Sequence, residues 1–248
     1  MSAMSAVVRD AWTTVVPDME DRHGPLPPLM LALTVVTGLV DAFSYLVLGH
    51  VFVANMTGNV VFSGFAIAGA AGFSLAASLS ALAAFAAGAL LGGRLAHGAG
   101  AHRGRVLHLA LLLETTLVLA AYVIAQVTDT SQVSTAVQYA LIVLLGLAMG
   151  VQNATARALA VPDLTTTVLT LTITGVAADS RLAGGKGSKV GRRLLSAAAM
   201  FTGGLAGAVA VQHGGRALPL LFAAVLLVAA SVTAFVLTRS DASWTKPL

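Results

Sequence analysis

The residues most able to do chemistry are polar side chains that stand inside long apolar stretches. Asp41 is the only formally charged residue between Pro27 and Arg94. Burying a carboxylate at the depth of a membrane costs a few kcal/mol or more, and such a group usually faces a cavity or a partner. We therefore expect Asp41 to line a binding site for a solute or ion. The alternatives are that it pairs with a structural donor such as Arg157, or that it stays hydrated near the membrane surface.

Further polar residues gather in two apolar stretches, about 51 to 71 and about 159 to 178, which are broken by Asn, Thr, Gly or Pro. The free backbone groups and dipole ends of broken helices can replace water around an ion or polar solute. The candidate lining residues are Asn55, Thr57 and Asn59 in the first stretch, and Asp163, Thr165 and Thr167 in the second. The alternative is that these residues cap the broken helix ends, and both roles can hold together.

Three more residues belong to the same hypothesis. Asn153 and Arg157 stand near the end of an apolar run. Arg157 is either a fixed cation for an anionic group of the solute or a side chain that extends to the membrane surface. Glu114 stands in the middle of another run, where it and Asp41 are candidates for a proton path. The alternative for Glu114 is a hydrogen bond to a neighbouring helix.

The sequence lacks the residues that several kinds of chemistry require. The chain has no cysteine, which excludes disulfides, thiolate metal sites and thiol nucleophiles. His50, His97 and His213 show no metal-ligand spacing, so we predict no metal site, and no cofactor is expected. The motifs of hydrolases are missing, which argues against an enzyme. The formal charge is +4, but the basic residues stand in loops without nucleic-acid motifs, so no nucleic acid partner is expected.

The elements that must position these residues are apolar runs. Of the 248 residues, 57% are hydrophobic and 10% are charged, whereas a soluble domain carries about 25% charged residues. Runs of about 20 apolar residues can cross a hydrocarbon core of ~30 Å as helices. Six such runs have the approximate bounds 28 to 48, 75 to 96, 106 to 126, 135 to 156, 194 to 212 and 217 to 238. The runs do not alternate in polarity, so the predicted fold class is all-α, a polytopic membrane helical bundle.

The basic residues predict the topology, because short cytoplasmic loops collect Lys and Arg. If the two broken stretches are re-entrant, entering and leaving on one side, every Lys and Arg except Arg157 and Arg216 lies in the cytoplasm. If both stretches cross fully, more basic residues fall outside. We therefore predict six spans plus two re-entrant segments. Both termini are then cytoplasmic, with tails at 1–27 and 239–248.

The same arrangement indicates an internal repeat, with residues 28–126 as the first membrane repeat and 127–238 as the second. Matches recur in the same order in both halves: VANMTGNVV from 53 with VPDLTTTVL from 161, Asp41 with Asn153, and Phe85 with Phe201. Each half carries three spans, which is an odd number. The two halves are therefore predicted to be inverted relative to one another.

The stretch GLVDAFSYLVLGHVFVANMTGN (Gly38 to Asn59), followed later by GVQNATARALAVPDLTTTVLT (Gly150 to Thr170), resembles the YoaK-like family of bacterial multi-pass membrane proteins. The resemblance covers about residues 28 to 238, and the paired motifs make it fairly specific. It implies a polytopic protein of the bacterial inner membrane. The family carries a domain-of-unknown-function label, so the resemblance implies no substrate, reaction or catalytic residue.

These observations favour a transporter of a small solute or ion, in which the broken segments and Asp41 line a central site opened alternately to each side. Proton coupling is one variant of this hypothesis. The alternatives are a passive channel and a non-transporting scaffold or sensor subunit. The expected partners are the lipid bilayer and the small solute or ion. The small-residue pairs Gly88 with Gly92 and Gly203 with Gly207 are expected to pack within the bundle, and a homodimer contact is the alternative.

Overall fold

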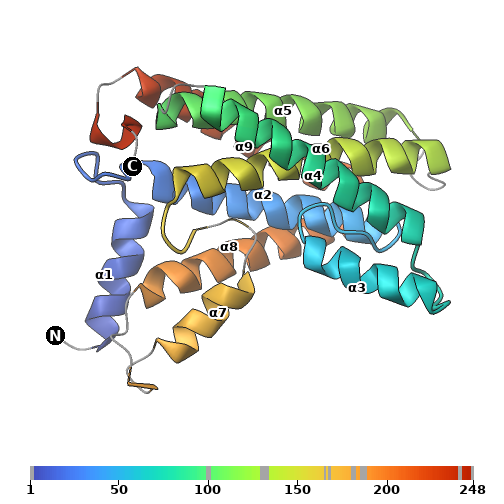
Figure 1. Ribbon diagram of the computed structural model, residues 1–248, viewed down its shortest axis with the longest axis horizontal. Coiled ribbons are helices and arrows are strands. Elements are labelled where there is room, and N and C mark those ends of the chain that lie inside the picture. Colours follow the sequence, from blue (N-terminus) through green and yellow to red (C-terminus); the bar gives the residue numbers. More distant parts are fainter. Residues whose placement is uncertain are drawn as a thin grey trace.

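The computed structural model describes residues 3–98, 102–128, 134–164, 166, 169–179, 183–184, 189–239 and 242–246. The long helices run side by side, and α1 lies across one end of them (Figure 1). In chain order the helices are α1 (Ala3–Val15), α2 (Leu26–Val47), α3 (Met56–Ile67), α4 (Leu75–Gly98), α5 (Arg103–Val127), α6 (Thr135–Leu159), α7 (Leu169–Ala178), α8 (Val190–Val209), the π-helix η3 (Ala210–Gly214), α9 (Leu218–Thr238) and the 3-10 helix η4 (Ser243–Thr245).

Six helices in the described part of the chain are long and apolar enough to cross a membrane: α2, α4, α5, α6, α8 with η3, and α9. Their bounds agree within a few residues with the six predicted runs, so the predicted helical bundle is confirmed. Several hydroxyl groups inside these helices bond to the preceding turn. Thr34 donates to the carbonyl of Met30 and Thr115 to that of Leu111. Such bonds to the preceding turn allow threonine to lie in an apolar environment.

Each of the two broken stretches contains a short helix, and the chain from Val51 to Asn55 that leads into the first of them is not helical. Helix α3 has 12 residues and α7 has 10, which gives lengths of about 18 and 15 Å, roughly half the thickness of a hydrocarbon core. Each begins near the middle of the bundle, and they end at opposite ends of it (Figure 1). Each broken stretch therefore turns back to the end from which it entered, as predicted for re-entrant segments.

Glycines bring two pairs of spans into close contact. Gly88 and Gly92 of α4 lie against the backbone of α6, and Gly203 and Gly207 of α8 lie against that of α2. At each position an added Cβ would collide with backbone atoms or with a small side chain of the partner helix. These small-residue pairs therefore serve packing within the chain, as expected from the sequence.

The contacts between helices fall into matching sets. Helix α2 packs on α8 and α9, and α6 packs on α4 and α5. In the same way α3 packs on α4, and α7 packs on α8. Helices α5 and α9, the third span of each half, contact one another. If α2, α3, α4 and α5 are exchanged with α6, α7, α8 and α9 respectively, the same set of helix contacts is obtained.

Both chain ends lie at the same end of the bundle, which we call the termini end (Figure 1). Arg103, which the sequence placed in a loop, begins α5 there and is only 5% exposed. Its guanidinium donates to the carbonyls of Arg22 at 2.7 Å and Leu159 at 2.6 Å. The fully buried Trp244 of η4 packs beside it against Gly104. Parts of both predicted tails are therefore packed on the bundle, because an arginine and a tryptophan hold them.

Candidate functional site

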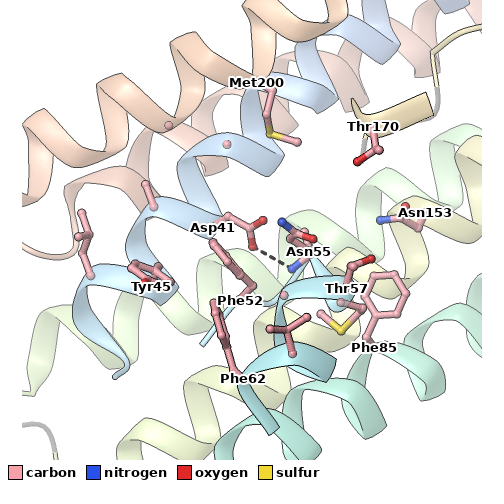
Figure 2. A pocket seen from close by; sticks show the side chains of 18 of the residues that line it. Asp41, Tyr45, Phe52, Asn55, Thr57, Phe62, Phe85, Asn153, Thr170 and Met200 are labelled. Carbon is pink, nitrogen blue, oxygen red and sulfur yellow. Dashed lines mark hydrogen bonds between the residues drawn. The ribbon is translucent and has the colours of Figure 1, made fainter. Parts of the chain in front are cut away.

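A cavity of about 920 Å³ lies among the membrane helices between α2, α3 and α8, and α4, α6 and α7 each add a residue to its wall. Figure 2 shows Asp41 and Asn55 on one side of it and Asn153 and Thr170 on the other. The polar side chains that line it are Asp41, Tyr45, Asn55, Thr57, Asn153 and Thr170. Residues from both halves of the chain therefore meet at one cavity, which we call the central cavity.

Asp41 serves this site in two ways. One carboxylate oxygen accepts hydrogen bonds from the backbone N–H groups of Val53 at 3.1 Å and Ala54 at 2.9 Å. These amides belong to the extended chain before α3, where no helical partner exists for them. The residue is 7% exposed and lines the central cavity. Asp41 therefore fixes the first re-entrant segment and places a carboxylate at the cavity wall; its partners are backbone amides rather than Arg157.

Asn55 and Thr57 lie at the start of α3 and line the central cavity. Asn55 occupies the N-cap position, but its side chain makes no capping hydrogen bond. The amide of Asn55 is therefore not used to close the helix end. The first turn of α3, with its partly positive dipole end, also faces the cavity at Met56 and Gly58.

Asn59 lies inside α3, where its side chain neither lines the central cavity nor caps the helix end, but binds the backbone of the preceding segment. It is fully buried, its carbonyl oxygen accepts from the N–H of Phe52 at 3.0 Å, and its amide nitrogen donates to the carbonyl of Phe52 at 2.6 Å. Both polar groups of the side chain are thus bound to one backbone residue. Asn59 supports the wall of the cavity from behind, because Phe52 is a lining residue.

In the second half, Asn153 and Thr170 reach the central cavity from α6 and from the first turn of α7. The amide of Asn153 donates to the carbonyl of Met149 at 2.9 Å. Its neighbour Gln152 donates to Thr37 of α2 at 2.8 Å and so joins α6 to α2. Arg157, one turn further along, is exposed and lines a second cavity instead.

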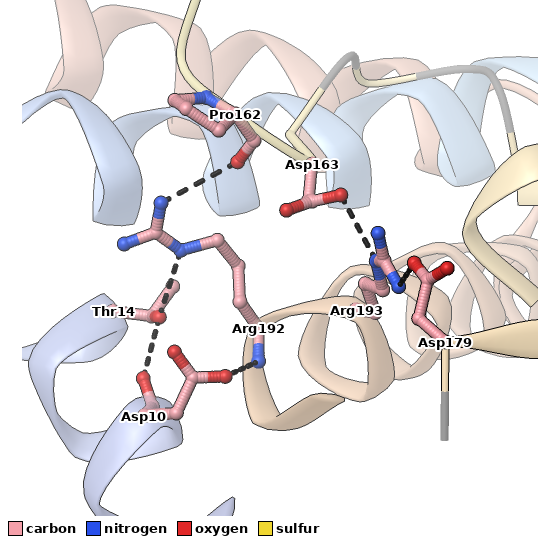
Figure 3. A network of polar contacts seen from close by, with 7 residues as sticks. All are labelled: Asp10, Thr14, Pro162, Asp163, Asp179, Arg192 and Arg193. Atoms are coloured by element: carbon pink, nitrogen blue, oxygen red, sulfur yellow. Dashed lines mark hydrogen bonds and ion pairs between the residues drawn. The ribbon is translucent and has the colours of Figure 1, made fainter. Parts of the chain in front are cut away.

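Asp163 lies at the termini end, in a network of ion pairs (Figure 3). Arg193 of α8 contacts Asp163 at 2.9 Å and Asp179 at 2.7 Å. Asp163 precedes α7 by several residues and Asp179 directly follows it, so Arg193 ties the end of that helix to the chain that comes before it. The adjacent Arg192 donates to the carbonyl of Pro162 at 3.4 Å. Thr165 and Thr167 lie outside the described residues.

Glu114 lies on α5, away from these groups. It is 1% exposed, and one of its carboxylate oxygens has no hydrogen-bond partner among the described residues. It is not among the residues that line the central cavity. The hypothesis of a proton path from Asp41 to Glu114 therefore has no continuous set of contacts behind it and stays a prediction.

The aromatic wall of the central cavity was missed by reasoning from polar residues. Tyr45 stacks on Phe52 with ring centroids 4.9 Å apart, and Phe52 stacks on Phe62 at 5.7 Å. Phe85 closes the wall from α4. Phenylalanines give no signal in a sequence that is mostly apolar, because lipid-facing, core and cavity-lining positions favour the same residue types.

The described residues contain no group of three or more His, Asp or Glu side chains arranged to hold a metal ion. Carboxylates are instead bound to backbone amides, as Asp41 is, or to an arginine, as Asp163 is. The polar groups that remain directed at the central cavity are amides, hydroxyls and one carboxylate. Such groups bind polar solutes through hydrogen bonds.

The fold and the cavity together define a polytopic α-helical membrane protein with two re-entrant segments. Residues 29–233 match the model of the family described as "Protein of unknown function (DUF1275)", and the chain belongs to this family. The chain is 32% identical over 152 residues to the UPF0700 transmembrane protein YoaK of Bacillus subtilis (strain 168). That alignment covers 61% of this chain and 65% of the relative, which is less than two thirds of the relative's length. No solved structure matches the chain.

Proposed function

We propose that the chain is a multi-pass transporter of a small solute or ion, with its binding site in the central cavity. One observation carries this proposal. Polar side chains from both halves, with Asp41 and Asn55 from the first and Asn153 and Thr170 from the second, line one cavity among the membrane helices. The cavity lies where two half-length helices begin. Transporters place their sites at such points, because free backbone groups and helix dipoles there replace water around the solute.

An inverted repeat is part of the proposal. The sequence pairs Asp41 with Asn153, and both line the central cavity. The helix contacts support the same pairing, since each contact within one set has a counterpart when the halves are exchanged. The half-helices α3 and α7 point in opposite directions along the bundle (Figure 1). An inverted pair of this kind can open a central site to one end of the bundle and then to the other.

The proposed location is the bacterial inner membrane, with both termini in the cytoplasm. The lysines and arginines at the termini end support this orientation, because positive residues collect on the cytoplasmic side. Transport rather than catalysis is proposed, with no nucleic acid partner. Proton coupling through Asp41 is a variant that a pH gradient tests.

The test uses purified protein and a library of small polar solutes. Solutes that raise the temperature of unfolding are then tested for uptake into liposomes, with and without a pH gradient. Gly204 lines the cavity and an added Cβ there meets nothing within 4 Å, so Gly204→Leu is expected to fill part of the cavity. Gly64 of α3 also has open space but lies outside the cavity lining, and Gly64→Leu is the matched control.

The proposal predicts saturable uptake that Gly204→Leu abolishes and Gly64→Leu preserves. Conductance that rises in proportion to the driving force, without saturation, would instead favour a channel. If no solute stabilises the protein and none is taken up, the proposal fails in favour of a scaffold.

A further inference from the structure

A second cavity, of about 800 Å³, lies between α4 and α6. It reaches the last turns of both helices at the termini end, where His97 and Arg157 line it. The central cavity, in contrast, reaches the last turn of α2 at the opposite end, where Tyr45 and Leu46 line it. The two cavities therefore extend from the interior toward opposite ends of the bundle.

The two cavities adjoin one another. Phe85 of α4 and Asn153 of α6 line both of them. Two cavities that share wall residues and extend to opposite ends form a route across the bundle, interrupted where those residues stand. Phe85 is the larger of the two side chains at this interruption.

We propose that the second cavity is the termini-end vestibule of the solute route and that Phe85 is the barrier between it and the central cavity. This inference rests on the proposed transport function. It assigns a new part of the site, since the hypotheses drawn from the sequence placed solute contacts only at polar residues. The side chain of Phe85 blocks the passage from the central cavity toward the termini end.

The backbone around Phe85 holds this barrier in place. Gly146 and Gly150 of α6 pack directly against the backbone at Phe85, where an added Cβ would meet its N or O atom. The main chain of α4 is therefore held close to α6 at this point, and the Phe85 ring projects from a fixed position on the backbone. For the same reason Phe85→Ala removes the ring without disturbing the contact between α4 and α6.

The counterpart of Phe85 in the second half does not occupy a matching position. Phe201, which the repeat pairs with Phe85, is 70% exposed and is not among the residues that line the two cavities. On this proposal the central cavity is closed toward the termini end by Phe85 and accessible from the opposite end, toward which it extends at Tyr45 and Leu46.

The vestibule differs from the central cavity in the sign of its charge. Among the described residues that line the vestibule, the formally charged one is Arg157, which is positive. Among those that line the central cavity it is Asp41, which is negative. A positive group in a recess raises the local concentration of anions. The vestibule is therefore expected to admit solutes that carry an anionic group in preference to cations.

The test needs no identified solute, because the chain contains no cysteine and a single introduced cysteine is its only thiol. Gly204→Cys reports on the central cavity and Gly93→Cys on the vestibule, and both positions have open space for a side chain. A membrane-impermeant methanethiosulfonate is added to either side of oriented vesicles. Sulfonate and trimethylammonium forms of the reagent are compared.

We expect the cysteine at 204 to react from the side opposite the termini, and the cysteine at 93 from the termini side. Adding Phe85→Ala should allow the cysteine at 204 to react from both sides. Phe62 lines the central cavity but not the vestibule, so Phe62→Ala is the matched control. It should leave unchanged the side from which the cysteine at 204 reacts. At position 93, Arg157→Gln should lower the ratio of sulfonate to trimethylammonium reaction rates by roughly twofold or more.

The inference is overturned if the cysteine at 204 reacts equally from both sides while Phe85 is present, or if Phe85→Ala leaves its sidedness unchanged. An unchanged rate ratio in Arg157→Gln would remove the preference for anions. These results are separate from the search for a solute. The labelling pattern can hold while no solute is transported, and transport can occur with the barrier at another residue.

Discussion

The two re-entrant segments have equivalent places in the bundle but are held by different forces. The segment before α3 is held by buried hydrogen bonds, from Val53 and Ala54 to Asp41 and between Phe52 and Asn59. Stacked aromatic rings cover it. The segment around α7 is held by Arg193, whose carboxylate partners Asp163 and Asp179 have side chains that are 20% and 50% exposed.

The two kinds of contact indicate that the second segment moves more easily than the first. A buried hydrogen bond is expensive to break because the groups it leaves have no water to replace their partner. A partly exposed ion pair is weak and is screened by salt. We infer that the first segment is a fixed wall of the central cavity and the second is the element that rearranges.

The largest expected effect comes from Asp41→Ala. This change leaves two backbone amides without their acceptor, and each buried unpaired donor costs about 1–3 kcal/mol. We expect a loss of about 3 kcal/mol in the free energy of unfolding, measured by thermal or denaturant unfolding in detergent. Asp41→Asn, which keeps one acceptor oxygen, should lose less. Unchanged stability in Asp41→Ala would show that the amides find other partners and that the first segment is not fixed.

Asn59→Ala is expected to rank next. It removes the two hydrogen bonds to Phe52 from a fully buried position, at a cost of about 2 kcal/mol. Ser63→Ala on the same helix is the control, because its hydroxyl only bonds back to the carbonyl of Asn59 and its loss should be within about 0.5 kcal/mol. The same unfolding measurement applies. Equal effects of the two changes would contradict the assigned support of Phe52.

The smallest effect on stability is expected from Arg193→Gln. Partly exposed ion pairs contribute about 1 kcal/mol or less, so global unfolding should change little. Hydrogen exchange of the amides in α7 should nevertheless become faster, while that in α3 stays the same. High salt should produce a similar increase in the unchanged protein. Exchange in α3 that is as sensitive to salt as in α7 would remove the distinction between the two segments.

The membrane spans could be predicted from the sequence because apolar runs of sufficient length have few alternatives to a membrane helix. The distribution of lysine and arginine then predicted that the broken stretches turn back. Asp41, Asn55 and Asn153 were expected at the site because polar groups at that depth need a reason to be there. All three line the central cavity.

Other features depend on tertiary contacts that leave no local pattern. Nothing near Asp41 in the sequence shows that its partners are amides 12 and 13 residues away. Asp163 was predicted to line the site, and nothing in the sequence shows that its partner is Arg193, 30 residues further along. Phe85 is one of nine phenylalanines in an apolar chain, and only the meeting of two cavities distinguishes it.

The most direct test of the shared central cavity is mutual protection between two single thiols, Asn55→Cys from the first half and Thr170→Cys from the second. Both residues line the cavity, so an impermeant thiol reagent should reach both from the same side. In the double variant, a bulky label at one position should slow reaction at the other, whereas a label at Gly64→Cys should not. Independent reaction of the two thiols, or reaction from opposite sides, would contradict a common cavity for the two halves.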